Sequence, residues 1–300
     1  MSPSTARTDG DSAPLTGQAR RDAIARGVAF PISPLGWIRL VGRFTLLLVM
    51  ALSFAMLHYV WRFFGAEPPW TRRILAAGAW IVGARVTRVG TPLQNDVFTV
   101  SNHLSWIDIM ALGGASGTSF VAKAELATAP IVGWLSTLHR SVYVKREDRF
   151  GVADQIDRLR AAIGTRWKIA VFPEGTTTDG HSLLQFKTPL LRVLEPPPPG
   201  VMVQPVMIDY GAAAEEIAWI GDETGLNNAK RILSRPGTFA IRVHFLDPFD
   251  PRDFPGRKAI AAESRRRIEA ALVAALGKPL RPFAWMIAPV RYEPLPPTEG

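Results

Sequence analysis

One histidine stands five residues before an aspartate in a mostly apolar stretch, at His103 and Asp108. Histidine exchanges a proton near neutral pH more readily than other side chains, and a carboxylate on its second ring nitrogen fixes the tautomer and stabilises the imidazolium. Residues five apart on one helix point about 140° away from each other, so both cannot lie mid-helix and touch. We therefore expect Ser105 to be the N-cap of a helix, with Asp108 as its third residue and His103 folded back from the preceding loop. The alternative is a capping histidine beside an ordinary first-turn acid.

A second pattern follows an apolar segment, residues 167–172, that is typical of a buried strand. This segment ends in a turn that contains Glu174, Gly175 and Thr176. The carboxyl end of a strand is the edge at which ligands bind in α/β sheets. Glycine permits a tight bend, the threonine offers a hydroxyl, and the glutamate can accept hydrogen bonds from neighbouring amides or from a substrate. Taken alone, this turn would be read as a solvated acid.

The order of these motifs resembles the glycerolipid and lysophospholipid acyltransferase family, typified by 1-acylglycerol-3-phosphate acyltransferase. The resemblance covers about residues 85 to 250, and the segment 121–126 is similar to the family as well. Four blocks carry it, in the family's order: Asn102–Asp108, Val142–Arg146, Phe172–Thr176 and Gln204–Ile208.

The resemblance implies that His103 is the general base for an acceptor hydroxyl and that Asp108 orients it. The activated oxygen would attack the thioester of acyl carrier protein or coenzyme A through a tetrahedral oxyanion. No metal or other cofactor is implied. The chain has no cysteine and no Gly-x-Ser-x-Gly motif, so covalent catalysis of the hydrolase kind lacks its usual parts. The substrate-binding residues that the resemblance implies are Lys123, Arg146, Glu174, Gly175, Thr176 and Lys187.

Two of these cations have a simpler interpretation. Arg146 precedes a mixed charge cluster, residues 147–149, which is typical of a solvated loop. Lys123 lies in a good helix start and could pair with Glu125 or with solvent.

The acceptor is less well defined than the reaction. Many phosphatidate-forming members carry arginine after Glu-Gly-Thr, but this chain has Thr177, and a hydroxyl cannot replace a bidentate guanidinium. The sequence Thr-Thr-Asp-Gly at 177–180 also resembles the branch that acylates lyso-ornithine lipid. We expect 1-acylglycerol-3-phosphate as the default acceptor because it is the commonest in the family, with lyso-ornithine lipid as the alternative. A catalytically silent membrane lipid-binding protein is the rival of another class.

A lipid substrate predicts membrane contact. Residues 44–61 contain no Asp, Glu, Lys or Arg, and Arg39, Arg43 and Arg62 flank this run. Such a run has about the minimum length that spans a bilayer core, and basic and aromatic flanks are typical of a span. Two alternatives remain open, a buried helix of a soluble core and a helix that enters and returns from one leaflet. Residues 73–82 predict a shorter surface or half-inserted helix.

The formal net charge of +9 and the pI of about 10.3 suit an anionic lipid surface. Nucleic acid is disfavoured because the basic residues flank apolar segments and form no single stripe. The apolar run begins too late for a secretory signal peptide, so we expect the catalytic part to face the cytoplasm, at the inner membrane if the source is bacterial.

The chain divides into a disordered segment (1–30), membrane-anchoring helices (31–84), a catalytic domain (85–280) and an irregular tail (281–300). Alternating strand and helix patterns in the third part predict an α/β fold with a mixed, mostly parallel sheet flanked by helices. The expected strands cover 85–89, 97–100, 141–144, 168–172, 202–208 and 239–245, and the expected helices cover 105–113, 130–138, 152–164 and 257–276.

Overall fold

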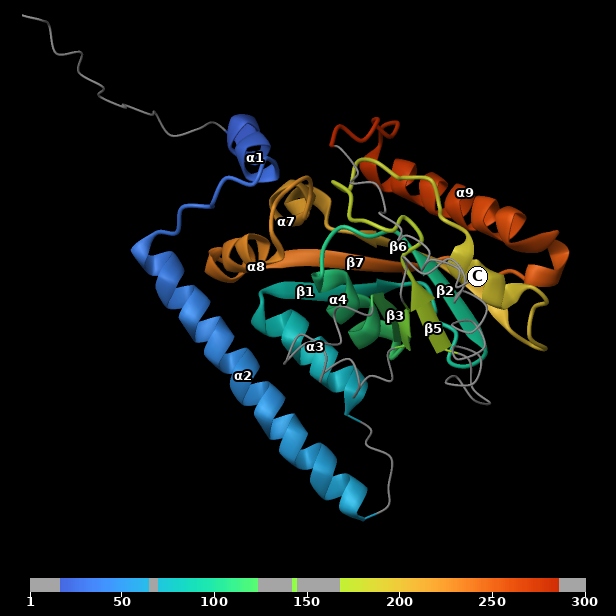
Figure 1. The fold of residues 1–300 in the computed structure, drawn as a ribbon, viewed down its shortest axis with the longest axis horizontal. Coiled ribbons are helices and arrows are strands. Elements are labelled where there is room, and N and C mark those ends of the chain that lie inside the picture. Colours follow the sequence, from blue (N-terminus) through green and yellow to red (C-terminus); the bar gives the residue numbers. More distant parts are fainter. Residues whose placement is uncertain (1–16, 65–69, 124–141, 145–167, 286–300) are drawn as a thin grey trace, which may run out of the picture.

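The computed structural model of the 300-residue chain describes residues 17–64, 70–123, 142–144 and 168–285. A seven-stranded sheet in the order β1-β7-β6-β2-β5-β3-β4 forms its centre (Figure 1). Neighbouring strands run parallel except β6 and β7, which are antiparallel. The fold is therefore α/β with a mixed, mostly parallel sheet, as predicted. The strands are β1 (Ala84–Val89), β2 (Val97–Ser101), β3 (Ser119–Lys123), β4 (Val142–Val144), β5 (Lys168–Val171), β6 (Met202–Asp209) and β7 (Phe239–Phe245).

Helices cover both faces of the sheet. One face packs against α9 (Gly256–Leu276) and the 3-10 helix η2 (Pro189–Leu194), which bury Ile260 and Leu191 against the sheet. The opposite face packs against α3 (Thr71–Ile81), α4 (Ile107–Ser116), α7 (Ala214–Ile217) and α8 (Gly225–Ser234). The two buried clusters give the chain an apolar core on each side, which fixes the carboxyl ends of the central strands.

All six expected strands are present among the described residues, with ends that agree to within one residue. The expected helix at 257–276 is also present as α9, whereas the expected helices at 130–138 and 152–164 lie outside the described residues. The interpretation of Lys123 as part of a helix start is wrong, because this residue ends strand β3. Phe120 and Val121 favour a strand, and β3 pairs with both β4 and β5.

The N-terminal part begins with α1 (Gly17–Ala25), so the expectation of disorder over residues 1–30 is wrong for this helix. The amide of Asp222 donates to the carbonyl of Ala25 at 2.7 Å, and the amide of Phe30 donates to Asn227 Oδ1 at 3.0 Å. These contacts hold α1 and its linker on the first turn of α8 and the loop that precedes it. In the described part of the tail, residues 281–285 form no helix or strand.

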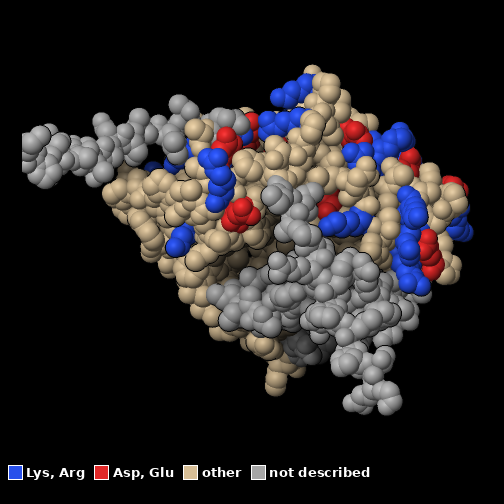
Figure 2. All heavy atoms as spheres, turned by 45° about the horizontal axis from the view of Figure 1, so that its top comes forward, with Lys and Arg blue, Asp and Glu red and all other residues tan. Residues whose placement is uncertain are grey.

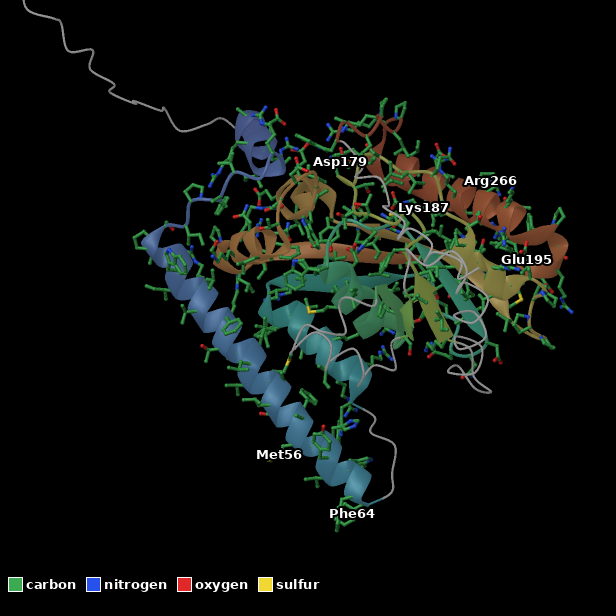
Figure 3. The ribbon with its side chains drawn as sticks, in the orientation of Figure 1. Met56, Phe64, Asp179, Lys187, Glu195 and Arg266 are labelled. Carbon is green, nitrogen blue, oxygen red and sulfur yellow. The ribbon has the colours of Figure 1, made fainter. Side chains whose placement is uncertain are left out.

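A long helix, α2 (Pro34–Phe63), follows and runs away from the sheet (Figure 1). Its segment Pro34–Trp61 is long and apolar enough to cross a membrane, with a mean hydropathy of 2.1, and its most apolar part is almost entirely exposed. Met56 and Phe64, near the C-terminal end of α2, point away from the sheet (Figure 3). The alternative of a buried core helix therefore does not fit this segment.

Helix α3 contributes to the same core as α4. Ala79 and Val82 are buried against α4 and the sheet, while Trp80 is exposed. This helix therefore packs as a layer of the α/β unit, and the predicted domain boundary at residue 85 stays a prediction.

Candidate active site

Three sequence blocks meet at one edge of the sheet. Strands β2, β5 and β6 are parallel neighbours, with β2 between the other two. The first, third and fourth blocks include or follow the carboxyl ends of these strands. Parallel strands present these ends at the same edge, where α/β proteins bind ligands. The arrangement of strands thus brings together residues that lie more than 70 positions apart.

The predicted pair is formed. His103 Nδ1 lies 2.8 Å from Asp108 Oδ2, and the aspartate side chain is fully buried. The histidine side chain is 19% exposed, and its Nε2 atom makes no hydrogen bond within the described residues. Because a carboxylate only accepts, Nδ1 carries the proton of the neutral ring and Nε2 is left with a free lone pair. His103 is therefore oriented as a base.

Asp108 has donors on both oxygens. Its Oδ2 atom also accepts from the amides of Leu104 at 2.6 Å and Ser105 at 2.9 Å, and its Oδ1 atom accepts from the hydroxyl of Tyr210 at 2.6 Å. Four donors around a carboxyl group match the ionised form, which has no proton to place. A buried negative charge therefore faces the imidazole.

The expected N-cap is wrong by one residue. Trp106 occupies the N-cap position, and α4 begins at Ile107, so Asp108 is the second helical residue. The amide of Ser105 donates to the side chain of Asp108, and the carbonyl of Ser105 accepts from the amide of Asp108 at 3.0 Å. The short turn that results brings His103 back over the first turn of α4, as the spacing required.

The third block and the residues just after it hold the main chain of His103 from both sides. Its amide donates to Glu174 Oε1 at 2.9 Å, and its carbonyl accepts from the amide of Thr178 at 2.8 Å. The ring of Phe172 stacks on the imidazole, with centroids 4.2 Å apart and planes at 17°. The two motifs therefore act as one unit, in which the turn after β5 fixes the position of the base.

Glu174 is buried at 1% exposure and uses both of its oxygens within the protein. Its Oε2 atom accepts from the amide of Leu184 at 3.0 Å. Burial raises the pKa of Glu174 from 4.5 to about 8, although the amides of Leu184 and His103 act in the opposite direction. The contacts of this residue are those of a positioning group, and its predicted contact with substrate stays a prediction.

This pKa makes stability depend on pH. The folded state keeps a proton that the unfolded state releases above about pH 4.5, so the free energy of unfolding should fall as the pH rises toward 8. The slope should reach about 1.4 kcal/mol per pH unit. Glu174→Gln cannot titrate, so the difference in stability between wild type and variant isolates this group. Melting temperatures from pH 5 to 9 in one detergent would measure it, and a difference that is constant over this range would contradict the assignment.

Gly175 and Lys187 lie together at the turn. Gly175 has φ of +76°, a conformation that strains other residues, and a Cβ there would lie 2.8 Å from Lys187 Nζ. The lysine amide donates to the carbonyl of Pro173 at 2.8 Å, and its side chain is exposed. Thr176 follows in the same turn and is half-buried. A cation thus lies beside the motif that positions His103 (Figure 3).

The other predicted cations are not placed at the site. Lys123 ends β3, but its side chain lies outside the described residues, as does the whole of Arg146. The structure therefore brings together His103, Asp108, Glu174, Gly175 and Lys187 from the predicted set.

Thr177, which stands where an arginine is common, uses its hydroxyl within the protein. This hydroxyl donates to the carbonyl of Trp219, and the amide of Trp219 donates to the carbonyl of Leu104 at 2.9 Å. Nearby, Nε and Nη2 of Arg281 both donate to Asp179 Oδ2, at 3.0 and 2.7 Å. Thr177 therefore ties the third block to the segment before α8 and offers no charge to an acceptor.

Two residues contribute to the site although the sequence reasoning assigned them no role, and only Asn102 belonged to a quoted block. Tyr210 follows β6 directly, is 2% exposed and donates to Asp108. Burial and the negative charge of Asp108 raise its pKa well above 10, so it stays a hydrogen-bond donor. Asn102 exchanges two hydrogen bonds with the main chain of Ile208, at 2.7 and 3.0 Å, and so fixes the end of β2 to β6. The position of Tyr210 two residues after the fourth block was the available signal.

The arrangement can remove a proton from a hydroxyl that approaches Nε2 of His103. The described residues contain no group of three or more His, Asp or Glu side chains suited to a metal ion. The chemistry derived from these side chains is general-base catalysis, with Asp108 stabilising the imidazolium as it forms.

Comparison with known proteins agrees with this geometry. A family model described as Acyltransferase matches residues 85–209. The lyso-ornithine lipid O-acyltransferase of Rhodobacter capsulatus is 33% identical over 211 residues, which cover 66% of this chain and 75% of that protein. The protein of the same name from Brucella abortus is 31% identical over 247 residues, which cover 76% of this chain and 92% of that protein.

The crystal structure of the 1-acyl-sn-glycerophosphate acyltransferase from Thermotoga maritima matches in fold. Its TM-score is 0.55 at 20% sequence identity, over 77% of this chain and 97% of that chain. The likeness in sequence to the two lyso-ornithine lipid acyltransferases, together with the family match over the blocks that form the site, shows that this chain belongs to the acyltransferase family.

Proposed function

We propose that the chain transfers a fatty acyl group from the thioester of acyl carrier protein or coenzyme A to the free hydroxyl of a lysolipid. The observation that carries the proposal is the free Nε2 of His103, whose other nitrogen is held by the buried Asp108. Nε2 takes the hydroxyl proton as the oxygen bonds to the thioester carbon. The tetrahedral intermediate then expels the thiolate, which takes the proton back from the imidazolium.

Lyso-ornithine lipid is the acceptor we propose. The relatives from Rhodobacter capsulatus and Brucella abortus carry this substrate in their names. Thr177 supplies no cation, and its hydroxyl is engaged by Trp219. The second candidate is 1-acylglycerol-3-phosphate, which the exposed ammonium of Lys187 beside Gly175 favours because a lysine can bind a phosphate as a point charge.

Turnover should be at least about tenfold faster on lyso-ornithine lipid than on 1-acylglycerol-3-phosphate. The phosphate headgroup lacks the bidentate arginine contact that Thr177 cannot supply, and the loss of such a contact costs about 1.4 kcal/mol or more. Purified full-length protein in detergent would receive a labelled acyl carrier and either lysolipid with the same acyl chain. Assays with acyl carrier protein and with coenzyme A thioesters identify the donor in the same series.

Faster turnover on the phosphate lipid would replace the acceptor but leave the reaction unchanged. Lack of turnover on both lipids with both donors would favour the silent lipid-binding alternative.

We also propose that α2 inserts in the membrane and that the catalytic domain faces the cytoplasm, where acyl carriers are found. The support is the length and apolar surface of Pro34–Trp61. The net charge of +9 suits an anionic surface. On the face seen in Figure 2, the described Lys and Arg side chains are interspersed with Asp and Glu and form no continuous stripe, which supports a lipid partner over nucleic acid.

Acidic substitutions on α2 should release the protein from membranes. Leu52 is 62% exposed and Met56 is 68% exposed, so changing both to Asp disturbs no packing in the domain. Each charge at the centre of a span costs about 2.5 to 3.5 kcal/mol of insertion free energy. The measurement is the fraction that sediments with membranes after carbonate washing, with the double Ala variant as the control. If the Asp variant sediments as wild type does, attachment lies in the catalytic domain.

A further inference from the structure

A cavity of about 680 Å³ lies away from the catalytic residues. Its walls come from α1, the linker to α2, the first turns of α2, and the segment from α7 through α8. This volume is in the range of sites for small ligands and headgroups. Neither His103 nor Asp108 lines the cavity, so a ligand held there is not at the reacting atom.

The walls of this cavity are built by specific contacts. The main-chain bond between Asp222 and Ala25 holds α1 in place, and Arg21 of α1 pairs with Glu215 of α7 at 2.7 Å. On the inner side, Arg231 is buried and bound to the buried Glu223 at 2.8 Å. The cavity is therefore part of the fold and is not a loose gap beside a terminal helix.

The charges in the lining leave two cations in excess. Three of the five arginines pair with the three glutamates there, since Arg235 also bonds Glu216 at 2.8 Å. The other two are Arg20 and Arg39, which have no carboxylate partner in the described part of the chain. The guanidinium of Arg20 lies 4.5 Å from the ring centre of Phe30. Arg39 is half-buried, so its charge is partly removed from water without compensation.

The position of Arg39 on α2 indicates where a ligand would come from. Ser33, Gly36 and Arg39 line the cavity at intervals of three residues, and the charge-free run begins at residue 44. Five residues of helix correspond to about 7.5 Å along its axis. The headgroup layer of one leaflet is about 5 to 8 Å thick. If α2 enters the bilayer at residue 44, the cavity lies at the level of the headgroups.

The orientation of α2 against the cavity is fixed by Arg43. Its Nη1 atom donates to the carbonyls of Ile232, Leu233 and Arg235 at 2.9 to 3.2 Å. These carbonyls belong to the C-terminal end of α8, where a cation is favourable. Because Arg43 and Arg39 lie one turn apart on the same helix, the contact with α8 also holds Arg39 at the cavity.

We propose that this cavity binds the anionic headgroup of a membrane lipid, whose phosphate oxygens pair with the guanidinium groups of Arg20 and Arg39. This inference rests on the proposed insertion of α2 but not on the transfer reaction. It gives the enzyme a second lipid site beside its acceptor site. Two guanidinium groups favour a phosphate because each can donate two hydrogen bonds to it.

The test is a calorimetric titration of the full-length protein in a non-ionic detergent, without acyl donor. The probes are dioctanoyl phosphatidylglycerol, dioctanoyl phosphatidylcholine and inorganic phosphate. Arg20→Gln/Arg39→Gln is compared with Arg26→Gln/Arg88→Gln, which removes the same charge from two exposed arginines outside the cavity. Melting temperatures check that both variants are folded.

We expect phosphatidylglycerol to bind wild type more tightly than either other probe. The cavity variant should bind it at least tenfold more weakly, and the control variant should stay within twofold of wild type. Equal losses in both variants, or no loss in the cavity variant, would overturn the site. Equal affinity for inorganic phosphate would overturn the lipid as its ligand. Because no acyl donor is present, these outcomes are independent of turnover.

Discussion

Replacing His103 by Ala should lower kcat for acyl transfer by about 10²- to 10⁴-fold, the usual contribution of a general base. The imidazole Nε2 is the free basic nitrogen at this edge of the sheet, within the part of the chain that the structure describes. The KM values should change little, because a general base acts in the transition state and adds little to the binding of the ground state. The measurement is initial rate against acceptor concentration with the preferred lysolipid.

Two further variants separate the base from the fold. His103→Gln can still donate to Asp108 but has no titratable nitrogen, so we expect it to lose as much activity as His103→Ala. His181→Gln changes a histidine whose Nε2 lies 3.7 Å from Glu215 and should stay within threefold of wild type. Full activity in His103→Gln would refute the role of His103 as the base.

The catalytic pair could be predicted because its residue types and spacing leave few options. His103 and Asp108 lie close together in sequence, so their contact depends only on a short turn at the start of α4. Six of the seven strands could be predicted, because apolar or alternating segments with a clear end are typical of strands, whereas β3 was not predicted. Local information of this kind does not depend on which strands become neighbours.

The rest of the site depends on pairing between distant strands. Tyr210 reaches Asp108 because β6 lies beside β2, a relation between segments about 100 residues apart in sequence. Similarly, Glu174 lies beneath the main chain of His103 because β5 is the other neighbour of β2. A sequence pattern indicated that the glutamate ends a strand. It left open whether the carboxyl group binds neighbouring amides or a substrate, and the structure shows bonds to the amides of His103 and Leu184.

The structure of the N-terminal part also depends on contacts between residues that are distant in sequence. Composition predicted disorder for residues 1–30, since α1 is polar and has little helix-stabilising charge at its ends. Contacts from Asp222, Asn227 and Glu215 hold α1 and its linker against the domain. Tertiary contacts can stabilise a short helix that would not form alone.

Asp108→Asn should lower kcat by about 10³-fold while the protein stays folded. Three donors face the position of Oδ2, so the side-chain oxygen of the new asparagine should occupy it. His103 then keeps its Nδ1 proton and its orientation. The amide nitrogen then faces Tyr210, whose hydroxyl can rotate to accept. What is lost is the negative charge that stabilises the imidazolium. At about 4 Å and an effective dielectric constant of about 20, that charge is worth about 4 kcal/mol, which corresponds to about a thousandfold in rate.

Tyr210→Phe is the matched control, because it removes one donor from Oδ1 but leaves the charge and the contact with His103. We expect a loss of about 1 to 3 kcal/mol in stability and at most about tenfold in kcat, since a buried acceptor loses its partner. The ratio of the two losses, measured by initial rates beside melting temperatures, separates the charge of Asp108 from the packing around it. If Tyr210→Phe lowered kcat as much as Asp108→Asn, the placement of the carboxylate rather than its charge would limit the reaction, and Asp108 would act mainly by holding the turn that carries His103.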